Sequence, residues 1–346
     1  MHRTIVIIHP GTLGDILLSL AAIRQIRHAF PVCDLALLAQ GDVSRLLFVC
    51  GEVQAVFPIE ARAFSLLVGA LPLEPDLDFW LRRCDLAVAW MRDPEERLRS
   101  TLLEAGAKQV IVQSPMSSAR VAVHQEDRFM ETIETVGHGV QDRQRLALPS
   151  SLMASAKVEL EAIAGIDGHP LALFHPGSGS LHKCGAPEVF AAAIAYCQTR
   201  GLVPVVVEGP ADGGAVARVI EMCTRKPRVL QHESLLSIAG VLAQATMFIG
   251  NDSGLSHLAA RLHVPMITVF GPTDPRRWAP RGPEVTVLTG EACRCEGWEA
   301  VRSCLQKPCL RVPVDRLLAA CEQTLKSQDI QATPVSDCLV MSEDLC

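Results

Sequence analysis

The fold is decided by the opening stretch of the chain, where residues 4–20 read TIVIIHPGTLGDILLSL. Thr4–His9 is a short run rich in β-branched residues, which favours a buried strand. Pro10–Asp15 then brings a proline and two glycines, which are typical of a turn. From Ile16 onward, apolar residues recur at helical spacing as far as Phe30. The stretch therefore predicts a strand, a glycine loop and a helix, the unit that opens a parallel α/β fold.

The same alternation continues along the rest of the chain. Apolar segments of strand character are expected at Asp34–Leu38, Val53–Pro58, Leu86–Trp90, Gln109–Gln113, Leu171–His175, Leu202–Glu208, Met247–Gly250 and Pro265–Phe270. Helices are expected at Leu152–Ile163, Pro187–Arg200, Ser234–Ala243, Ser253–Leu262 and Pro313–Lys326. Strands that alternate with helices imply βαβ units, in which right-handed crossovers join the strands of a parallel sheet.

The length of 346 residues exceeds one typical domain, so two domains are expected. The pattern of strands and helices restarts after a polar turn at Asp167–Pro170. We therefore expect one α/β domain over residues 1–160 and a second over residues 161–326. Residues 327–346 lack periodicity, and a disordered tail is expected there.

Composition and charge exclude several classes of protein. Apolar residues make up 49% of the chain and aromatic residues only 4%, which suits buried parallel strands with covering helices. The net charge of -6 argues against nucleic-acid binding, which needs a concentrated basic surface. No apolar run approaches the roughly 18–20 residues that cross a bilayer, and the first residues do not read as a secretion signal. A cytoplasmic protein is therefore expected.

The first glycine loop, residues 9–15, contains an acid where the helix begins. Backbone N–H groups in such a loop, together with the helix N-terminus, can contact a ligand. Asp15 falls in the first helical turn, where the helix dipole alone favours a carboxylate. The alternative is that Asp15, at the end of a strand, acts as a general base. The spacing of Gly11 and Gly14 does not by itself decide between these roles.

A second loop after a predicted strand reads HPGSGSLHK over residues 175–183. Its small hydroxylated residues can donate hydrogen bonds to phosphate oxygens, and Lys183 supplies a mobile cation. A solvated glycine–serine turn is the alternative. Because the strand, the loop and the lysine occur together, we favour phosphate binding.

The most specific motif reads GNDSGLSHLAA over residues 250–260, where a predicted strand is followed by a predicted helix. Asp252 or Ser253 can serve as the N-cap of that helix. Ser253 and Gly254 also leave the first N–H groups of the helix accessible to a diphosphate. His257 follows Ser253 by four residues and therefore lies on the same helix face.

A further turn, GPTDP at residues 271–275, follows the next predicted strand and places Thr273 near the same site. Together with residues 250–260, it resembles the signature of the ADP-heptose:lipopolysaccharide heptosyltransferases, glycosyltransferase family 9. The LGDILL stretch at residues 13–18 resembles the Gly-Asp loop of that family, and residues 175–183 resemble its donor-phosphate loop. The motifs in this order are far more specific together than any one alone.

The resemblance implies a GT-B architecture, in which two Rossmann-like domains face each other across a cleft. It implies that the C-terminal domain binds the nucleotide sugar and the N-terminal domain binds the acceptor. Asp15 would be the general base, and Lys183 would stabilise the leaving diphosphate. The donor-binding residues implied in this way are Ser178, Gly179, Ser180, Lys183, Glu208, Asp212, Asp252, Ser253, Gly254, His257 and Thr273. The acceptor-binding residues expected on the N-terminal domain are Thr12, Gly14, Arg92 and Arg120.

The resemblance also implies a reaction: inverting transfer of heptose from ADP-heptose to a lipopolysaccharide-core acceptor of the lipid A-Kdo type. No cofactor is expected, and a lipid-linked acceptor implies peripheral contact with the inner membrane. Two alternatives stay open: a family member that uses another nucleotide sugar or acceptor, and a nucleotide-sugar-binding protein without transferase activity. A dinucleotide oxidoreductase is disfavoured, because neither glycine loop matches Gly-x-Gly-x-x-Gly.

Two loops depart from the pattern of the family. The family usually has Trp-Pro shortly after the lysine, whereas here Lys183 is followed by Cys184-Gly185-Ala186-Pro187. Without that tryptophan, the loop around Lys183 is expected to be looser. In the first loop, His9-Pro10-Gly11 replaces a more usual arginine and small polar residues, so the acceptor contacts are expected to differ.

The chain also contains 13 cysteines, several of them inside apolar runs, where a thiol acts as a small hydrophobic group. Four thiolates near the C-terminus could bind zinc, and these belong to Cys293, Cys295, Cys304 and Cys309. Their spacing is not that of a zinc ribbon. We expect ordinary reduced thiols there, with a structural zinc site as the alternative.

Overall fold

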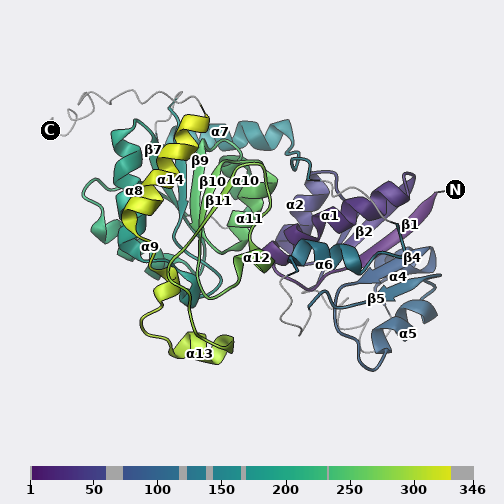
Figure 1. The fold of residues 1–346 in the computed structure, drawn as a ribbon. Helices are drawn as coiled ribbons and strands as arrows, with labels where there is room; N and C mark the ends of the chain where they lie inside the picture. Colours follow the sequence, from purple (N-terminus) through teal and green to yellow (C-terminus); the bar gives the residue numbers. More distant parts are fainter. Residues whose placement is uncertain are drawn as a thin grey trace. The chain divides into compact units, whose positions relative to one another are not determined.

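The computed structural model describes residues 2–59, 73–116, 123–137, 143–164, 169–231 and 234–328 (Figure 1). The elements up to residue 131 are β1 (Arg3–Ile8), α1 (Leu13–Ala29), β2 (Cys33–Ala39), α2 (Gly41–Val49), β3 (Ala55–Pro58), α4 (Pro75–Arg82), β4 (Leu86–Ala89), α5 (Arg97–Glu104), β5 (Val110–Val112) and α6 (Gln125–Glu131). The later elements are α7 (Ser150–Ala164), β6 (Leu171–His175), η1 (Leu181–Lys183), α8 (Pro187–Thr199), β7 (Val203–Glu208), α9 (Gly213–Met222), β8 (Arg228–Gln231), α10 (Leu235–Leu242), β9 (Met247–Asn251), α11 (Gly254–Arg261), β10 (Met266–Phe270), α12 (Pro275–Trp278), β11 (Val285–Thr289), α13 (Gly297–Ser303), η2 (Pro308–Leu310) and α14 (Val314–Ser327). Arg120 and residues 329–346, which include most of the expected tail, lie outside the described residues.

These elements form two compact units. Unit 1 comprises Met1–Leu152, Ser234–Ala239 and Pro275–Arg281, and unit 2 comprises Met153–Glu233, Gly240–Asp274 and Gly282–Cys346. The short segment that ends at Arg281 is anchored within unit 1, because the Arg281 guanidinium binds both carboxylate oxygens of Asp127 at 2.6 Å. A bidentate pair of this kind is stronger than a single neutral hydrogen bond.

Unit 1 is built on a parallel sheet of five strands in the order β3-β2-β1-β4-β5. Ile5–Ile8 in the central strand β1 are all fully buried, so both faces of the sheet are covered. Val6 and Ile8 pack on one face against α4 and α5, through residues such as Leu81 and Leu102. This strand order, 3-2-1-4-5, is that of a Rossmann-like sheet.

Unit 2 contains a parallel sheet of six strands in the order β11-β10-β9-β6-β7-β8. Counted from β6 as the first strand, the order is 3-2-1-4-5-6, which is the Rossmann order. One face packs against α8, α9 and α14, in a core that includes Phe174, Phe190, Ile249 and Leu317 (Figure 1). The two parallel α/β sheets expected from the sequence are therefore confirmed.

Two strands of unit 2 were not predicted from the sequence, and both are edge strands. In β8 only Leu230 is buried, and in β11 only Leu288 is buried. A strand at the edge of a sheet needs few apolar side chains, so it lacks the continuous apolar run that marks a central strand. The sequence pattern therefore detected the interior strands of this sheet and missed both of its edge strands.

Among the described residues, no helix combines the length and the apolar composition that crossing a membrane requires.

Candidate functional site

Three loops of unit 2 meet at the carboxyl edge of its sheet. They follow β6, β9 and β10, which are neighbours in the strand order β10-β9-β6. The order of the sheet reverses between β6 and β9, and ligands of open α/β sheets bind at such a switch point, outside the carboxyl ends of the strands. The polar residues predicted from the motifs at residues 175–183, 250–260 and 271–275 come together here.

The first loop is tied to its neighbours through His175, the last residue of β6. His175 Nε2 lies 3.0 Å from Asp212 Oδ2, and His175 Nδ1 lies 3.2 Å from Ser253 Oγ. All three side chains are buried. The imidazole therefore bridges the Asp212 carboxylate and the Ser253 hydroxyl, one through each ring nitrogen. His175 was not among the predicted site residues, although a histidine at the end of a strand and directly before Pro-Gly was a visible signal.

Asp212 is the anion of this buried network. Burial raises the pKa of Asp212, but the hydrogen bond and charge of His175 and the backbone N–H groups of Gly209 and Ser178 outweigh burial, and they hold that pKa below its ordinary value. Gly177 lies so close to Asp212 that a Cβ atom at residue 177 would overlap the carboxylate. The glycine is therefore required where the loop passes the acid. Contact of Asp212 with the donor stays a prediction.

The loop after β9 is organised by Asn251, which is fully buried. Its Nδ2 donates to the Pro176 carbonyl at 2.8 Å, and its Oδ1 accepts from the Gly185 N–H at 2.9 Å. A second link joins the same two loops, because Ser178 Oγ donates to the Asp252 carbonyl at 2.7 Å. The Ser178 hydroxyl thus fixes the loop, and Asn251 is a positioning residue that the sequence analysis did not single out.

Lys183 is held by an acid of the neighbouring loop. Its Nζ lies 2.8 Å from Asp252 Oδ2, in a pair in which the Lys183 side chain is 23% exposed and the Asp252 side chain is 6% exposed. Thr273 Oγ1 donates to the same carboxylate oxygen at 2.5 Å. Lys183 also lies 5.8 Å from the centroid of the Trp298 ring, within cation–π range. The predicted residues of all three loops are therefore in contact, and the lysine stays open to solvent.

The N-terminus of α11 lies beside this pair. Ser253 is the N-cap residue, but its side chain makes no capping hydrogen bond, because its Oγ lies near His175 and near Ser256 Oγ at 3.4 Å. The first N–H groups of α11, which begins at Gly254, consequently lack a side-chain acceptor from the cap. Such a helix end is a favourable place for an anion. His257 is buried on the same helix.

The structure also places the other residues that were predicted to bind the donor. Ser180 caps η1, where its Oγ accepts from the His182 N–H at 3.3 Å. Gly179 is exposed, in open space. Glu208 ends β7, and its Oε1 accepts from Gln231 Nε2 at 3.2 Å. Glu208 therefore lies on the β7–β8 side of the sheet, where its described contact is with the edge strand β8.

Unit 1 has its own switch point, between β1 and β4, where the first glycine loop lies. Thr12 is the N-cap residue of α1, and its N–H and Oγ1 both donate to Asp15 Oδ2, at 3.0 and 2.9 Å. The structural role expected for Asp15, that of a carboxylate in the first turn of the helix, is thus present in the structure. Asp15 Oδ1 makes no hydrogen bond to the part of the chain that is described. Gly14 lies between these residues in the first turn.

His9 forms the buried floor of that loop. Its ring lies 5.4 Å from Trp90 and 5.2 Å from Phe129, and its Nδ1 accepts from the Gly11 N–H at 3.0 Å. Burial lowers the pKa of His9 to about 4, against the opposing effect of Asp15. A neutral, buried imidazole therefore supports the loop that carries Asp15. The expected acceptor residue Arg92 is exposed, and Arg120 lies outside the described residues.

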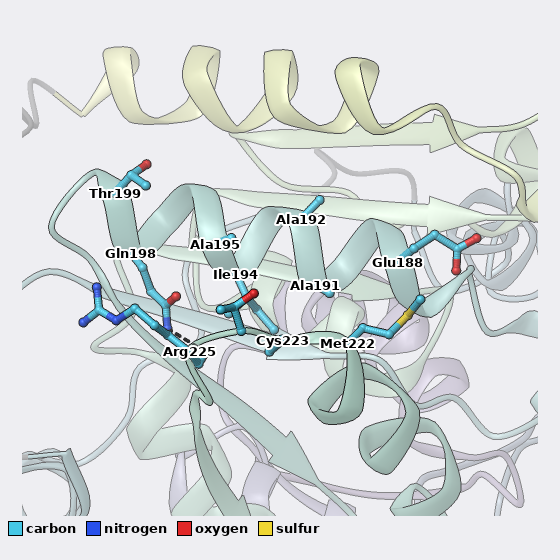
Figure 2. A pocket seen from close by; sticks show the side chains of 11 residues that line it. Glu188, Ala191, Ala192, Ile194, Ala195, Gln198, Thr199, Met222, Cys223 and Arg225 are labelled. Atoms are coloured by element: carbon cyan, nitrogen blue, oxygen red, sulfur yellow. Dashed lines mark hydrogen bonds between the residues drawn. The ribbon is translucent and has the colours of Figure 1, made fainter.

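Two hollows lie away from these loops. One has a volume of about 440 Å³ and lies along α8 and the end of α9, where Ala191, Ala192 and Ala195 leave room beside Met222 and Cys223 (Figure 2). The other, of about 220 Å³, lies at the amino edge of the first sheet, near Arg3 and Asp85. Neither is lined by a predicted site residue, and neither combines convergent polar groups with a strand carboxyl end.

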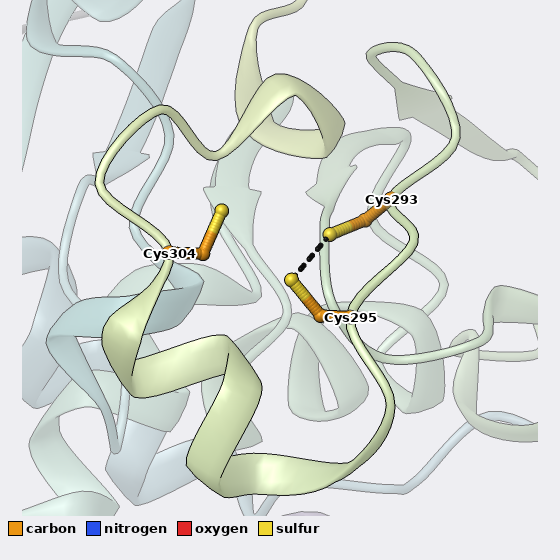
Figure 3. Close-up of side chains that lie close together, drawn as sticks. All are labelled: Cys293, Cys295 and Cys304. Atoms are coloured by element: carbon orange, nitrogen blue, oxygen red, sulfur yellow. Dashed lines mark hydrogen bonds between the residues drawn. The ribbon is translucent and has the colours of Figure 1, made fainter.

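The predicted cysteine cluster is present in unit 2. The thiols of Cys293, Cys295 and Cys304 lie within 4.8 Å of one another, and Cys293 Sγ is 2.9 Å from Cys295 Sγ (Figure 3). Cys309 is buried beside them and interacts with the Cys293 thiol. These are free cysteines, so the structure brings three sulfur atoms together, with the Cys309 thiol next to that of Cys293, and does not cross-link them.

Two Rossmann-type sheets, with a glycine–serine loop, a lysine and a helix N-terminus at the switch point of the second, form an arrangement suited to binding the phosphates of a nucleotide. The family model described as glycosyltransferase family 9 (heptosyltransferase) matches residues 105–307, more than half of the chain. The chain therefore belongs to glycosyltransferase family 9, and the family expected from the motifs is confirmed.

Individual relatives agree with this assignment. Lipopolysaccharide heptosyltransferase 3 of Escherichia coli strain K12 is 23% identical over 286 residues, which cover 77% of this chain and 82% of that protein. The crystal structure of a glycosyl transferase family 9 protein from Veillonella parvula has a TM-score of 0.79 at 20% identity, covering 94% of this chain and 98% of that one. The E. coli ADP-heptose LPS heptosyltransferase II has a TM-score of 0.74 at 18% identity, covering 94% and 100%. The GT-B fold expected from the sequence is thereby confirmed.

Proposed function

We propose that this glycosyltransferase transfers heptose, with inversion, from ADP-heptose to a lipopolysaccharide-core acceptor of the lipid A-Kdo type. The observation that carries the proposal is the Lys183–Asp252 pair beside the uncapped N-terminus of α11. A solvent-accessible cation and free helix N–H groups are the chemistry that binds a diphosphate. The names of the relatives, which are lipopolysaccharide heptosyltransferases, support the choice of sugar and acceptor.

Unit 2 is the proposed donor-binding unit. The diphosphate would take hydrogen bonds from the first turn of α11 and from the loop that contains Ser178, Gly179 and Ser180. Lys183 would stabilise the negative charge that the leaving ADP gains as the bond to the sugar breaks. Since these dipoles and this charge are already in place, they would act as preorganised electrostatic stabilisation. Glu208, Asp212 and Thr273 are proposed to shape the donor side of the site.

Unit 1 is the proposed acceptor-binding unit, and Asp15 is its proposed general base. An inverting transfer needs a carboxylate to take the proton from the acceptor hydroxyl as that oxygen attacks the sugar. Asp15 is fixed by two hydrogen bonds to its Oδ2, so its Oδ1 is the oxygen proposed to accept that proton. Thr12, Gly14, Arg92 and Arg120 are proposed to contact the acceptor. The enzyme is proposed to be cytoplasmic, and a lipid-linked acceptor would bring it to the inner membrane as a peripheral protein.

The test separates donor binding from transfer by comparing Asp15→Asn with Lys183→Met. Asp15→Asn should bind ADP within about 2-fold of wild type and lose at least about 100-fold in turnover. Lys183→Met should weaken ADP binding by about 10- to 100-fold, since one hydrogen bond to a charged group is lost. Affinity is measured by calorimetry, turnover by release of ADP from ADP-heptose with a core acceptor, and inversion by the anomeric configuration of the product.

Asp76→Asn is the matched control, because Asp76 is an exposed acid in the first turn of another helix of unit 1. It should leave both affinity and turnover unchanged. Undiminished turnover in Asp15→Asn would remove Asp15 from the reaction. Release of UDP or GDP from the corresponding sugars, with no release of ADP from ADP-heptose, would favour another donor. Nucleotide binding without any transfer would favour a binding protein.

A further inference from the structure

The cysteine cluster lies on a loop that projects from the body of unit 2 and carries α13 (Figure 1). Two backbone hydrogen bonds close the loop at its base: the Gly290 N–H donates to the Cys309 carbonyl at 2.9 Å, and the Glu291 N–H donates to the Pro308 carbonyl at 3.1 Å. Between these residues, Val301 is the one buried residue of α13. A segment with so little apolar burial gains little from a hydrophobic core, so another interaction must hold its shape.

The sulfur atoms are arranged as a set of ligands for one ion. The thiols of Cys293, Cys295 and Cys304 point toward one another from two sides of the loop (Figure 3). The Lys307 N–H lies 3.4 Å from Cys304 Sγ and donates to it, a contact that stabilises negative charge on sulfur. Lys307 adopts a left-handed conformation with φ of 41°, which a residue other than glycine keeps only where its surroundings enforce it.

The chemistry of the donor set fits a thiophilic metal. Three or four thiolates in tetrahedral array are the ligands of Zn²⁺ and of tetrahedral iron. Tetrahedral zinc, with Zn–S bonds of about 2.3 Å, separates its sulfur ligands by roughly 3.8 Å. The three sulfur atoms lie within 4.8 Å of one another, a range that includes this spacing. The distance between Cys293 Sγ and Cys295 Sγ, which is 2.9 Å, would have to increase by about 1 Å when the ion binds. Cys309 is buried at the base of the same loop and interacts with the Cys293 thiol, so it is the candidate for a fourth ligand beside the three clustered thiols.

The same loop contacts the proposed donor loop. Lys307 Nζ lies 2.8 Å from His182 Nδ1, and the Trp298 ring lies 5.8 Å from Lys183 Nζ. His182 and Lys183 belong to η1, the turn that carries the diphosphate-binding lysine. The indole of Trp298 thus stands beside Lys183, where the sequence after the lysine lacks the tryptophan usual in the family. Any group that orders the cysteine loop therefore orders the surroundings of Lys183.

We propose that Cys293, Cys295, Cys304 and Cys309 bind one divalent thiophilic metal ion, Zn²⁺ or Fe²⁺, and that the bound ion holds Trp298 and Lys307 against the donor loop. The metal site stands on the sulfur cluster alone. Its effect on ADP affinity rests on the proposed function. The ion has a structural role here, since all four ligands come from the protein and the site is closed.

Metal binding is tested first, without reference to activity. The full-length protein is expressed without an affinity tag that binds metals. It should contain about one equivalent of zinc or iron per chain, as measured by inductively coupled plasma mass spectrometry. The double variant Cys295→Ser/Cys304→Ser changes only partly exposed positions and should lose at least about 90% of that metal. Cys33→Ser, a partly exposed cysteine of unit 1, is the matched control and should retain it.

The outcomes of this first test are decisive. Less than about 0.1 equivalent of any transition metal in wild type, both as purified and after anaerobic addition of Zn²⁺ or Fe²⁺, would overturn the proposal. Full metal content in the double variant would overturn the assignment of these ligands. A disulfide between Cys293 and Cys295, found by mass spectrometry of freshly prepared protein at full occupancy, would also exclude the metal site.

The second test measures the coupling to the donor loop. Trp298→Ala should weaken ADP binding by about 2- to 5-fold, the equivalent of one partly exposed cation–π contact, with metal content unchanged. The Cys295→Ser/Cys304→Ser protein should show a loss at least as large. Leu305→Ala, at a residue of the same loop that is 96% exposed, is the control and should bind ADP as wild type does.

The two proposals can fail separately. If wild type contains metal but does not bind ADP, the proposed function is wrong and the metal site stands. If wild type binds ADP and the Trp298→Ala and cysteine variants bind it equally well, the coupling is refuted while donor binding stands.

Discussion

Asp212→Asn tests the buried network that joins the loop after β6 to α11. In the protein, Asp212 Oδ2 accepts hydrogen bonds from His175 at 3.0 Å and from the Gly209 N–H at 3.0 Å. The asparagine amide keeps one oxygen but replaces the other with an NH₂ group. If the asparagine oxygen takes the place of Oδ2, the NH₂ group faces the backbone N–H of Ser178, so two donors oppose each other in a site where the Asp212 side chain is only 10% exposed.

The magnitude follows from these contacts. A hydrogen bond to a charged group contributes about 1.5–3 kcal/mol, and a buried donor left without an acceptor costs about 1–3 kcal/mol. Since one oxygen is retained, we expect the free energy of unfolding of unit 2 to fall by about 2–4 kcal/mol. For a unit of this size each kcal/mol lowers Tm by about 2–4 °C, so Tm should fall by about 4–16 °C.

The effect has a defined pH dependence. The folded pKa of Asp212 lies below the ordinary value of 3.8, because the hydrogen bonds from His175 and the backbone outweigh burial, which acts in the opposite direction. A lowered carboxyl pKa contributes stability that is present above the unfolded pKa and is lost as pH falls through the folded pKa. The stability difference between wild type and Asp212→Asn should therefore be constant from about pH 7 to 5 and shrink below about pH 4.

The assay is urea and thermal unfolding followed by circular dichroism, at several pH values. Asp315→Asn, at an exposed acid in the first turn of α14, is the control and should stay within about 0.5 kcal/mol of wild type. A Tm for Asp212→Asn within about 1 °C of wild type at pH 7 would refute the reasoning, as would a difference that grows toward acid pH.

Three further substitutions test other buried polar groups. Burial lowers the pKa of His9 from 6.5 to about 4. Between about pH 6.5 and 4 the unfolded chain therefore binds more protons than the folded protein, and acidification through this range should lower the free energy of unfolding by up to about 3 kcal/mol. His9→Phe should flatten that part of the pH profile in urea unfolding, and equal slopes would contradict this. Arg24→Met leaves Glu52, which is 11% exposed, without its partner and should cost about 3–5 kcal/mol by thermal unfolding, part of it recovered in Arg24→Met/Glu52→Leu. Asn251→Ala should cost about 2–4 kcal/mol and speed amide exchange in the loop after β6, and protection equal to wild type there would show that Asn251 does not hold the loop.

The central elements of both sheets could be predicted because they are buried on both faces. β6 and β9 match their predicted segments to within one residue, and their side chains are fully buried. The helices α2, α4, α5 and α6, which are short, were not predicted. A helix of seven to nine residues offers at most about two and a half turns of periodicity, which is a weak signal in the absence of a motif such as the one that marks α11.

The candidate site divides in the same way. Lys183, Asp252 and Ser253 were predicted because each stands in a local motif at a strand–helix junction. His175 and Asn251 were missed as positioning residues, since their partners are 37 to 78 residues and 66 to 75 residues away along the chain. Contacts over such separations depend on which loops become neighbours, and the strand order decides that.

The Lys183–Asp252 pair also bears on how a nucleotide would enter and leave. The Lys183 ammonium already has a counter-ion 2.8 Å away, so a diphosphate that bound there would exchange partners with Asp252 instead of neutralising an isolated charge. When the spent nucleotide departs, the carboxylate can recapture the lysine, and no unpaired charge is left behind. Such an exchange would lower the gain from binding and ease product dissociation, a step that limits turnover in many enzymes.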